Sequence, residues 1–308
     1  MRNNPMVLPV LALLAGSALW ASSFVVLKIA FRHYDPMVVM FGRMFVASIV
    51  FLFLSRNFRH QRYEKGDWKA LVFMATCEPC LYFVFEAFAL ENTHAGQAGM
   101  IVSLLPLIVA LGAHFLLKEH ISRRTMSGFL LAVVGAVWLS AGAVASEGAP
   151  NPVLGNFLEF LAMICAAGYM ITLKRMSVRY SPLFLTAVQA FMGTLFFFPL
   201  LFLPTTTPPT TLAAEGLLAI GYLGVGITFG AYCLYNYGAS KIPAHQASAF
   251  TNTIPVLTLI MAWAWLDERL TFVQYLASAV VLAGVILSQD RSTQPTKNLT
   301  ENNDTPSV

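Results

Sequence analysis

Long apolar runs alternate with short polar segments along the whole chain. Ten of these runs are close to the ~20 residues that a helix needs to cross the hydrocarbon core of a bilayer. The segments between them carry turn residues, such as Asp35-Pro36 and Ser181-Pro182. The pattern predicts an all-α membrane protein with ten transmembrane helices, over 7–30, 37–55, 68–90, 95–117, 125–143, 153–173, 183–203, 213–237, 244–266 and 272–288.

The composition agrees with this interpretation and excludes two other classes of protein. Apolar residues make up 57% of the 308 residues and charged residues 11%, and the mean hydropathy is +0.67. Soluble domains carry about 25% charged residues, so this chain could not cover a water-exposed surface. Aromatic residues at 13% exclude a disordered chain. The polar segment 289–308 is predicted to be a disordered tail.

The positive charges predict the orientation of the ten spans. If residues 1–6 are cytoplasmic, 15 Lys and Arg residues fall on the cytoplasmic side, and three, Lys28, Arg32 and Arg269, on the other. Positive residues concentrate in cytoplasmic loops, so both termini are predicted to be cytoplasmic. The cytoplasmic residues are Arg2, Arg56, Arg59, Arg62, Lys65, Lys69, Lys118, Arg123, Arg124, Lys174, Arg175, Arg179, Lys241, Arg291 and Lys297.

The two halves of the chain resemble each other. Residues 95–98 (AGQA) match 244–247 (AHQA), and the same offset places Pro106 on Pro255 and Glu119 on Glu268. This predicts two five-helix repeats, over 7–147 and 148–288. Because five is odd, the second repeat crosses the membrane in the opposite direction. Inverted repeats suit alternating access to a site at the midplane, and chance similarity between apolar helices is the alternative.

These motifs resemble those of the drug/metabolite transporter superfamily, in particular its ten-span EamA-type carriers. The resemblance covers residues 7–288 and rests on the duplication and on a small-residue helix start, a central proline and a terminal Glu in each half. It implies a bacterial inner-membrane carrier of amino acids or other small metabolites, often an exporter, with a central cavity between the halves. The motifs indicate the family and do not identify the substrate.

Ionisable residues inside spans are costly and therefore indicate a cavity or a charged partner. The third span carries Glu78, Tyr82 and Glu86, whose spacing of four predicts one helical face. Pro79 is expected to break the helix beside Glu78. Glu78 is then a proton-coupling carboxylate or the anchor of a substrate ammonium group; the structural alternative is an ion pair with Arg43.

Arg43, inside the second span, is expected to pair with Glu78 or Glu86, or to bind a substrate carboxylate. Pro106 and Pro255 are expected to interrupt the fourth and ninth spans, or to act as simple packing kinks. Further side chains predicted to line a cavity, with helix packing as the alternative, are Trp20, Tyr232, Asn236 and Asn252.

Other functions find little support in the sequence. It contains no H-E-x-x-H, no G-x-S-x-G and no phosphate-binding glycine loop, so we expect no enzyme, cofactor or metal site. Cys77 and Cys80 lie within an apolar span and lack a second ligand pair. The expected partners are the lipid bilayer, a small organic solute and protons, with no nucleic acid. Spans 125–143 and 272–288 are candidate packing or dimer surfaces, and a proton-coupled multidrug exporter is the alternative function.

Overall fold

The computed structural model describes residues 6–58, 61, 63–117 and 122–288. The predicted cytoplasmic segment 1–6 (apart from Met6), the tail 289–308 and the repeat marker Glu119 lie outside the described residues. In the described part every regular element is a helix, which confirms the prediction of an all-α protein.

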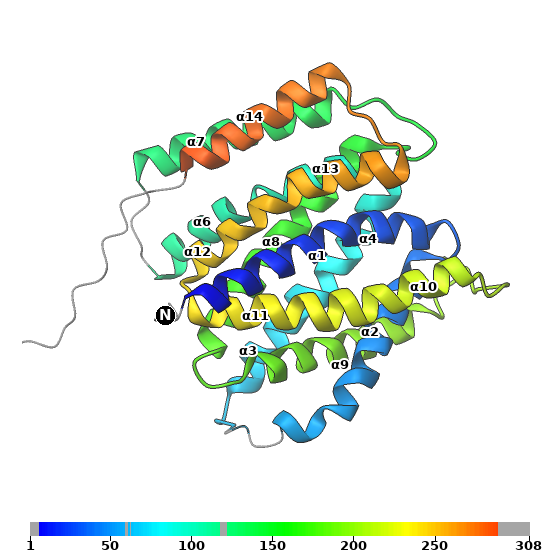
Figure 1. The fold of residues 1–308 in the computed structure, drawn as a ribbon, viewed down its shortest axis with the longest axis vertical. Helices are drawn as coiled ribbons and strands as arrows, with labels where there is room; N and C mark the ends of the chain where they lie inside the picture. Colours follow the sequence, from blue (N-terminus) through cyan, green and yellow to red (C-terminus); the bar gives the residue numbers. More distant parts are fainter. Residues whose placement is uncertain (1–5, 59–60, 62, 118–121, 289–308) are drawn as a thin grey trace, which may run out of the picture.

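The helices follow the predicted apolar runs in order (Figure 1). Several spans are divided where the helix changes type, notably by the π-helical segments η2 and η3 and the 3₁₀ segment η4. The elements are α1 (Val7–Phe31), α2 (Pro36–Phe53), η1 (Ser55–Phe58), α3 (Asp67–Ala75), η2 (Thr76–Leu81), α4 (Tyr82–Asn92), α5 (Ala95–Val102), α6 (Leu105–Leu117), α7 (Arg123–Ala141), α8 (Pro152–Met176), α9 (Pro182–Leu200), α10 (Ala214–Tyr222), η3 (Leu223–Ala231), α11 (Tyr232–Lys241), α12 (Ala244–Ala249), η4 (Phe250–Asn252), α13 (Thr253–Leu266) and α14 (Phe272–Ser288).

Nine helical segments of the described chain are long and apolar enough to cross a membrane. Some of these segments combine neighbouring elements, as in Asp67–Asn92 and Ala214–Lys241. The helix α14 is apolar but has 17 residues, close to the lower limit for a transmembrane helix. The chain is therefore a multi-pass membrane protein.

Three helices begin at joints that the sequence marks as turns. The side chains of Asp35, Asn151 and Ser181 accept hydrogen bonds from backbone N–H groups in the first turns of α2, α8 and α9. A proline follows each of them, and proline suits the first helical position because that position has no helical partner for its N–H. The polar segments between the spans therefore also supply the N-cap residues of these helices.

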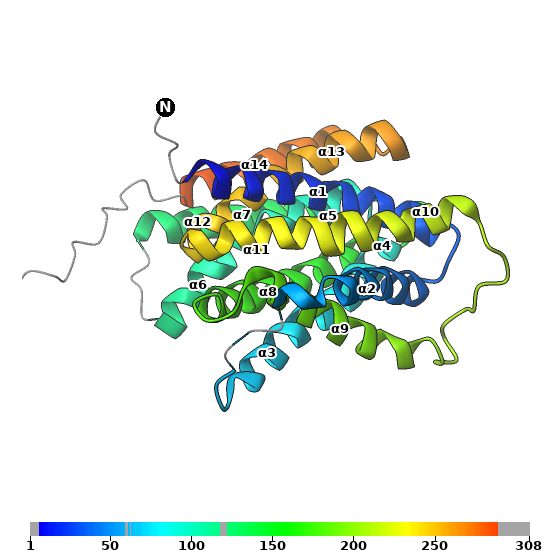
Figure 2. The same cartoon turned by 60° about the horizontal axis from the view of Figure 1, so that its bottom comes forward.

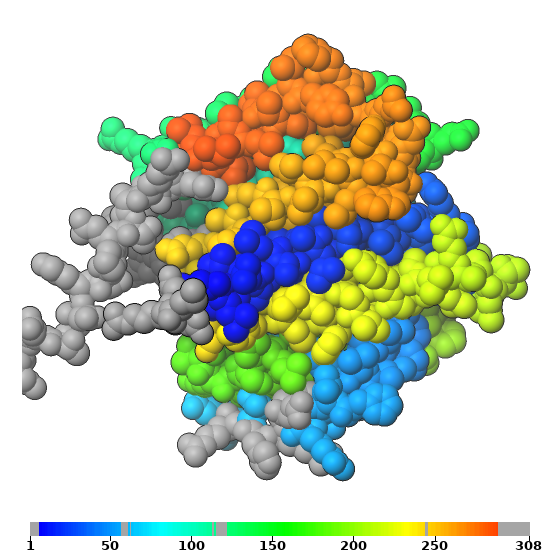
Figure 3. Space-filling view, in the orientation of Figure 1, coloured from blue at the N-terminus to red at the C-terminus, as the bar shows by residue number. Residues whose placement is uncertain are grey.

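The helices form a bundle in which α1 lies between α11 and α13, as the space-filling view shows (Figure 3). On the other half α8 packs against α4 and α6, and α2 packs against α9. Helices α7 and α14 form a pair at one edge of the bundle (Figures 1 and 2). A Cβ atom at Gly135 would lie 2.6 Å from the backbone nitrogen of Val281, so glycine permits the close contact of α7 with α14.

Candidate functional site

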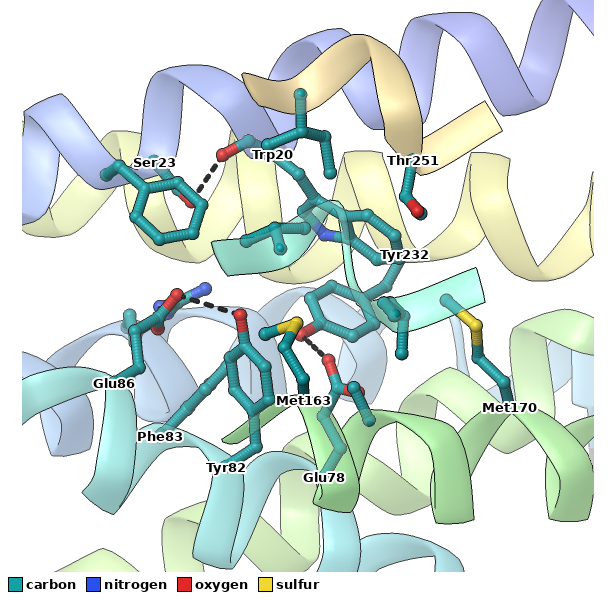
Figure 4. Close-up of a pocket in the computed structure, with 16 residues that line it drawn as sticks. Trp20, Ser23, Glu78, Tyr82, Phe83, Glu86, Met163, Met170, Tyr232 and Thr251 are labelled. Atoms are coloured by element: carbon teal, nitrogen blue, oxygen red, sulfur yellow. Dashed lines mark hydrogen bonds and ion pairs between the residues drawn. The ribbon is translucent and has the colours of Figure 1, made fainter. Parts of the chain in front are cut away.

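A cavity lies inside the bundle, lined by residues from both halves of the chain. It is a narrow, partly open space of about 440 Å³, a volume that includes open solvent at its mouth. Figure 4 shows its lining. The lining side chains are aromatic and apolar apart from a few polar and charged groups; they belong to Trp20, Ser23, Phe24, Arg43, Glu78, Tyr82, Phe83, Glu86, Val102, Leu105, Met163, Ala166, Met170, Tyr232, Thr251 and Ile254.

Glu78 lies where the third span loses its regular helical form. Its backbone is extended (φ −148°, ψ 117°) inside η2, directly before Pro79. Because the N–H of Tyr82 bonds to the carbonyls of Cys77 and Pro79, the carbonyl oxygen of Glu78 needs another partner. The Nε2 atom of Gln189, from α9, donates a hydrogen bond to that oxygen at 2.9 Å. The interruption therefore turns the Glu78 carboxyl group into the cavity while the other half satisfies its backbone.

One carboxyl oxygen of Glu78 is occupied and the other is open. The hydroxyl of Tyr232, from α11, donates a hydrogen bond to Oε1 of Glu78 (Figure 4). Oε2 is buried and has no hydrogen-bond partner among the described residues. The ring of Trp20 meets that of Tyr232 edge to face, with centroids 5.0 Å apart, and so holds the donor in place. An unpartnered buried acceptor beside a cavity is a position for a donor that arrives with a ligand.

Arg43 is buried and in contact with three different kinds of group. Its Nη1 lies 3.7 Å from Oε2 of Glu86, and its Nε donates a hydrogen bond to Thr228 at 3.2 Å. Its guanidinium carbon lies 4.0 Å from the ring centroid of Phe83, a cation–π arrangement. Glu86 thus compensates the charge of Arg43. The sequence predicted a pair with Glu78 or Glu86, and the structure shows the pair with Glu86.

Tyr82 and Glu86 lie one turn apart on α4 and face the same cavity. The hydroxyl of Tyr82 donates a hydrogen bond to Oε1 of Glu86 at 3.1 Å (Figure 4). The structure therefore brings Glu78, Tyr82 and Glu86 to one cavity, although Glu78 lies outside regular α-helix. Tyr82 holds Glu86 from one side and Arg43 approaches it from the other.

The predicted residues Asn236 and Asn252 lie next to this cavity without lining it. Asn236 accepts a hydrogen bond from the hydroxyl of Tyr169 and donates to Thr186, behind Tyr232. Asn252 ends the 3₁₀ segment η4, and its side-chain atoms are buried without a hydrogen-bond partner among the described residues. Its neighbour Thr251 reaches the cavity.

The fourth and ninth spans are interrupted just before their prolines. α5 ends at Val102 and α6 begins at Leu105, so Pro106 is the second residue of a new helix. α12 ends at Ala249 and the 3₁₀ segment η4 precedes α13, in which Pro255 is the third residue. Both interruptions lie beside the cavity, because Val102 and Leu105 line it from the fourth span and Thr251 and Ile254 from the ninth.

Sequence reasoning missed Phe83, Thr228 and Glu159. Phe83 and Thr228 contact Arg43, and nothing in their types separates them from other core residues of the spans. Glu159 is a carboxylate inside the apolar run 153–173, and the criterion that selected Arg43 applies to it equally. It lies on α8, fully buried.

Comparison with known proteins places this architecture in a family. The sequence pattern of the EamA-like transporter family matches the chain twice, over residues 7–141 and 153–289. The chain belongs to the EamA-like transporter family. The two matches cover most of the chain and confirm the family inferred from the motifs.

Relatives of this EamA-family chain are named as transporters. It is 27% identical to the uncharacterized transporter YetK of Bacillus subtilis, over 92% of this chain and 87% of the relative. It is 22% identical to a probable terminal-alkyne amino-acid exporter of Streptantibioticus cattleyicolor, over 91% and 93% of the two chains. A solved crystal structure shares the fold with a TM-score of 0.62 at 20% identity, over 90% of this chain and 96% of that one.

Proposed function

We propose that this membrane transporter exports amino acids or closely related small metabolites by alternating access. The solute would bind in the cavity between the two halves, and the halves would rock against each other to open it to either side. The observation that carries the proposal is the joint presence of Arg43 and the open carboxyl oxygen of Glu78 in the lining of one cavity.

The chemistry of the cavity suits a zwitterion. A guanidinium group binds a carboxylate through two parallel N–H donors, and a carboxylate accepts hydrogen bonds from an ammonium group. Arg43 is 3.7 Å from Glu86, longer than a direct hydrogen bond, so a solute carboxylate can compete for it. The aromatic rings of Trp20, Tyr82 and Tyr232 would hold the apolar part of the solute. The amino-acid exporter named among the relatives supports the same class of solute.

The proposed mechanism uses ten spans arranged as two inverted five-helix repeats. The packing supports this, because α1 lies against α11 and α13 while its counterpart α8 lies against α4 and α6. In Figure 1, α1 and α8 run in opposite directions along the bundle. The charge distribution supports a bacterial inner-membrane location with both termini cytoplasmic.

A contact between the two halves, near the C-terminal end of α1, would serve as the outer gate. The carboxylate of Glu268, which follows α13, accepts hydrogen bonds from the backbone N–H groups of Ala95 at 3.1 Å and Gly96 at 3.0 Å, at the start of α5. His94 Nδ1 lies 3.5 Å from the same carboxylate. Burial raises the pKa of Glu268, but the hydrogen bonds from His94, Gly96 and Ala95 outweigh burial, and the pKa lies below its ordinary value.

A metabolite profile of the growth medium tests the proposed function. Cells that overexpress the protein are compared with an empty-vector strain and with strains that produce Arg43→Ala or Arg175→Ala. Arg175 is exposed near the end of α8 and is the matched control. We expect one or more amino acids or related compounds to accumulate with the wild type and the control and to return to background with Arg43→Ala. Profiles that are the same in all strains would contradict the proposal.

A further inference from the structure

Glu159 is a buried carboxyl group whose oxygens have no protein partner. Its exposed fraction is 0%, and neither Oε1 nor Oε2 has a hydrogen-bond partner among the described residues. A carboxylate in this state would carry the full cost of removing a charge from water. The carboxyl group of Glu159 is therefore either protonated or needs a bound cation as its counterion.

The position of Glu159 on α8 connects it to the cavity. Met163, Ala166 and Met170 line the cavity and follow each other at helical spacing. Glu159 precedes Met163 by four residues and lies on the same face of α8. It is thus one turn beyond the cavity, toward the beginning of α8.

The packing of α8 against α4 places Glu159 level with Glu86. The two helices are antiparallel, because the N–H of Asn151 at the start of α8 bonds to the carbonyl of Asn92 at the end of α4, at 3.2 Å. A Cβ atom at Gly155 would lie 2.8 Å from the carbonyl oxygen of Ala89, so the helices approach closely there. Glu159 lies one turn beyond Gly155, and Glu86 lies about one turn before Ala89. The two carboxyl groups therefore lie at about the same level of two adjacent helices.

The charges buried inside the bundle do not balance unless protons are bound. Among the described residues, the buried charged side chains are one cation, Arg43, and three carboxyl groups, those of Glu78, Glu86 and Glu159. Fully ionised, they would leave two negative charges in a region of low dielectric constant. Glu86 is paired with Arg43, and two buried carboxylates at the same level of adjacent helices are unlike neighbours in water: without a further cation, ionising both is strongly disfavoured.

We propose that Glu86 and Glu159 form a proton-binding carboxyl pair, with Glu159 carrying the proton while Glu86 pairs with Arg43. The proton exchanges with water in the cavity through Glu86, which lines it. A second proton on the pair would free Arg43 for a carboxylate of the solute. The proton site does not depend on the identity of the solute. Only the last step, the release of Arg43 for a solute carboxylate, rests on the proposed function.

The other titratable groups near the pair lie on the elements packed against α8. Tyr82 on α4 interacts with both carboxyl groups and donates its hydrogen bond to Glu86. The groups on η2 and α11 interact with α8 further along, around Cys165 and Tyr169. Charged or titratable residues on the described elements in contact with α8 are Asp67, Lys69, Cys77, Glu78, Cys80, Tyr82, Glu86, Glu91, His114, Arg123, Arg124, Tyr232, Cys233, Tyr235, Tyr237, Lys241 and His245.

Infrared spectroscopy of the purified protein in lipid tests the proton site directly, without any solute. The carbonyl stretching band of protonated carboxyl groups is recorded at neutral pH for the wild type, Glu159→Gln and the control Glu147→Gln, which changes an exposed residue. Without solute, the charge count predicts two buried protons, on Glu78 and Glu159; the proposed function requires Glu78 to release its proton only when a solute ammonium group binds. Glu159→Gln should therefore remove about half of the band that is absent at high pH, and the control should keep all of it.

Two further measurements keep the test independent of how well one variant folds. In heavy water the Glu159 component of the wild-type band should shift, because its proton exchanges with cavity water. Arg43→Gln should enlarge the band, since Glu86 then also binds a proton. A wild-type band that is absent at neutral pH, that does not shift in heavy water, or that is unchanged in folded Glu159→Gln protein would overturn the proposal. These results would leave the metabolite profile, and hence the proposed function, unaffected.

Discussion

Arg43 and Glu86 form a buried ion pair, with Nη1 of Arg43 lying 3.7 Å from Oε2 of Glu86. The partners come from α2 and α4, and Glu78, the other acidic candidate, is bonded to Tyr232 instead. Arg43 is therefore compensated by Glu86, while the second carboxyl oxygen of Glu78 stays open for a donor on a solute.

Breaking this pair from one side should be costly. Glu86→Gln leaves the Arg43 guanidinium buried without a counterion, and the free energy of unfolding should fall by about 3–5 kcal/mol. Thermal unfolding of the purified protein in detergent measures the change, with the double variant Arg43→Met/Glu86→Gln as the partner experiment. The double variant should recover most of the loss. A single variant as stable as the wild type would show that the pair contributes nothing.

Removing the Tyr232 hydroxyl should weaken the hold on Glu78. Tyr232→Phe deletes the donor to Oε1 and leaves both carboxyl oxygens without a protein donor. The free energy of unfolding should fall by about 1–3 kcal/mol. Tyr275→Phe, at an exposed position on α14, is the control and should change it by less than about 0.5 kcal/mol. Equal effects of the two substitutions in denaturant titrations would argue against the bond.

The α7–α14 contact should not tolerate a side chain at its centre. Gly135→Ala places a methyl group against the Val281 backbone and should destabilise the protein by about 1–3 kcal/mol. Gly221→Ala is the matched control, because nothing lies within 4 Å of a Cβ atom there. The two melting temperatures, measured side by side, give the comparison. A Gly135→Ala protein that melts with the control would mean that the helices are further apart.

The contact of Glu268 with the start of α5 should depend on pH in one direction. The folded protein lowers the pKa of Glu268, so its contribution to stability is complete above the ordinary Glu pKa of about 4.3 and is lost as the pH falls through the lower, folded value. The difference in melting temperature between the wild type and Glu268→Gln should therefore be constant near neutral pH and shrink below about pH 4. A difference that grows on acidification would contradict the assignment.

The sequence predicted the helices well because the lipid leaves a chain few choices. Each span must satisfy its own backbone hydrogen bonds and expose apolar side chains, and both demands are visible in the apolar runs and in joints such as Asp35-Pro36. The cavity position of Glu78 and Glu86 follows from the cost of charges in lipid. Those constraints act on each span separately.

The missing part of the site depends on contacts between spans. Periodicity gives the depth of Arg43 but not the direction in which its side chain points, and the choice of Glu86 over Glu78 depends on how α2 and α4 are rotated. Asn236 was predicted to line the cavity. In the structure it accepts a hydrogen bond from Tyr169 instead and lies behind Tyr232. Contacts of this kind join different spans, and one sequence contains no signal for them.

The most direct test of the central claim is efflux from proteoliposomes loaded with a mixture of the common amino acids. Mass spectrometry of the external medium compares the wild type, Glu78→Gln, Arg43→Ala, the control Arg175→Ala and protein-free liposomes. The account predicts faster release of a subset of amino acids with the wild type and the control, and at least tenfold slower release with either cavity variant. Release from wild-type vesicles equal to that from protein-free liposomes, or cavity variants as fast as the wild type, would contradict it.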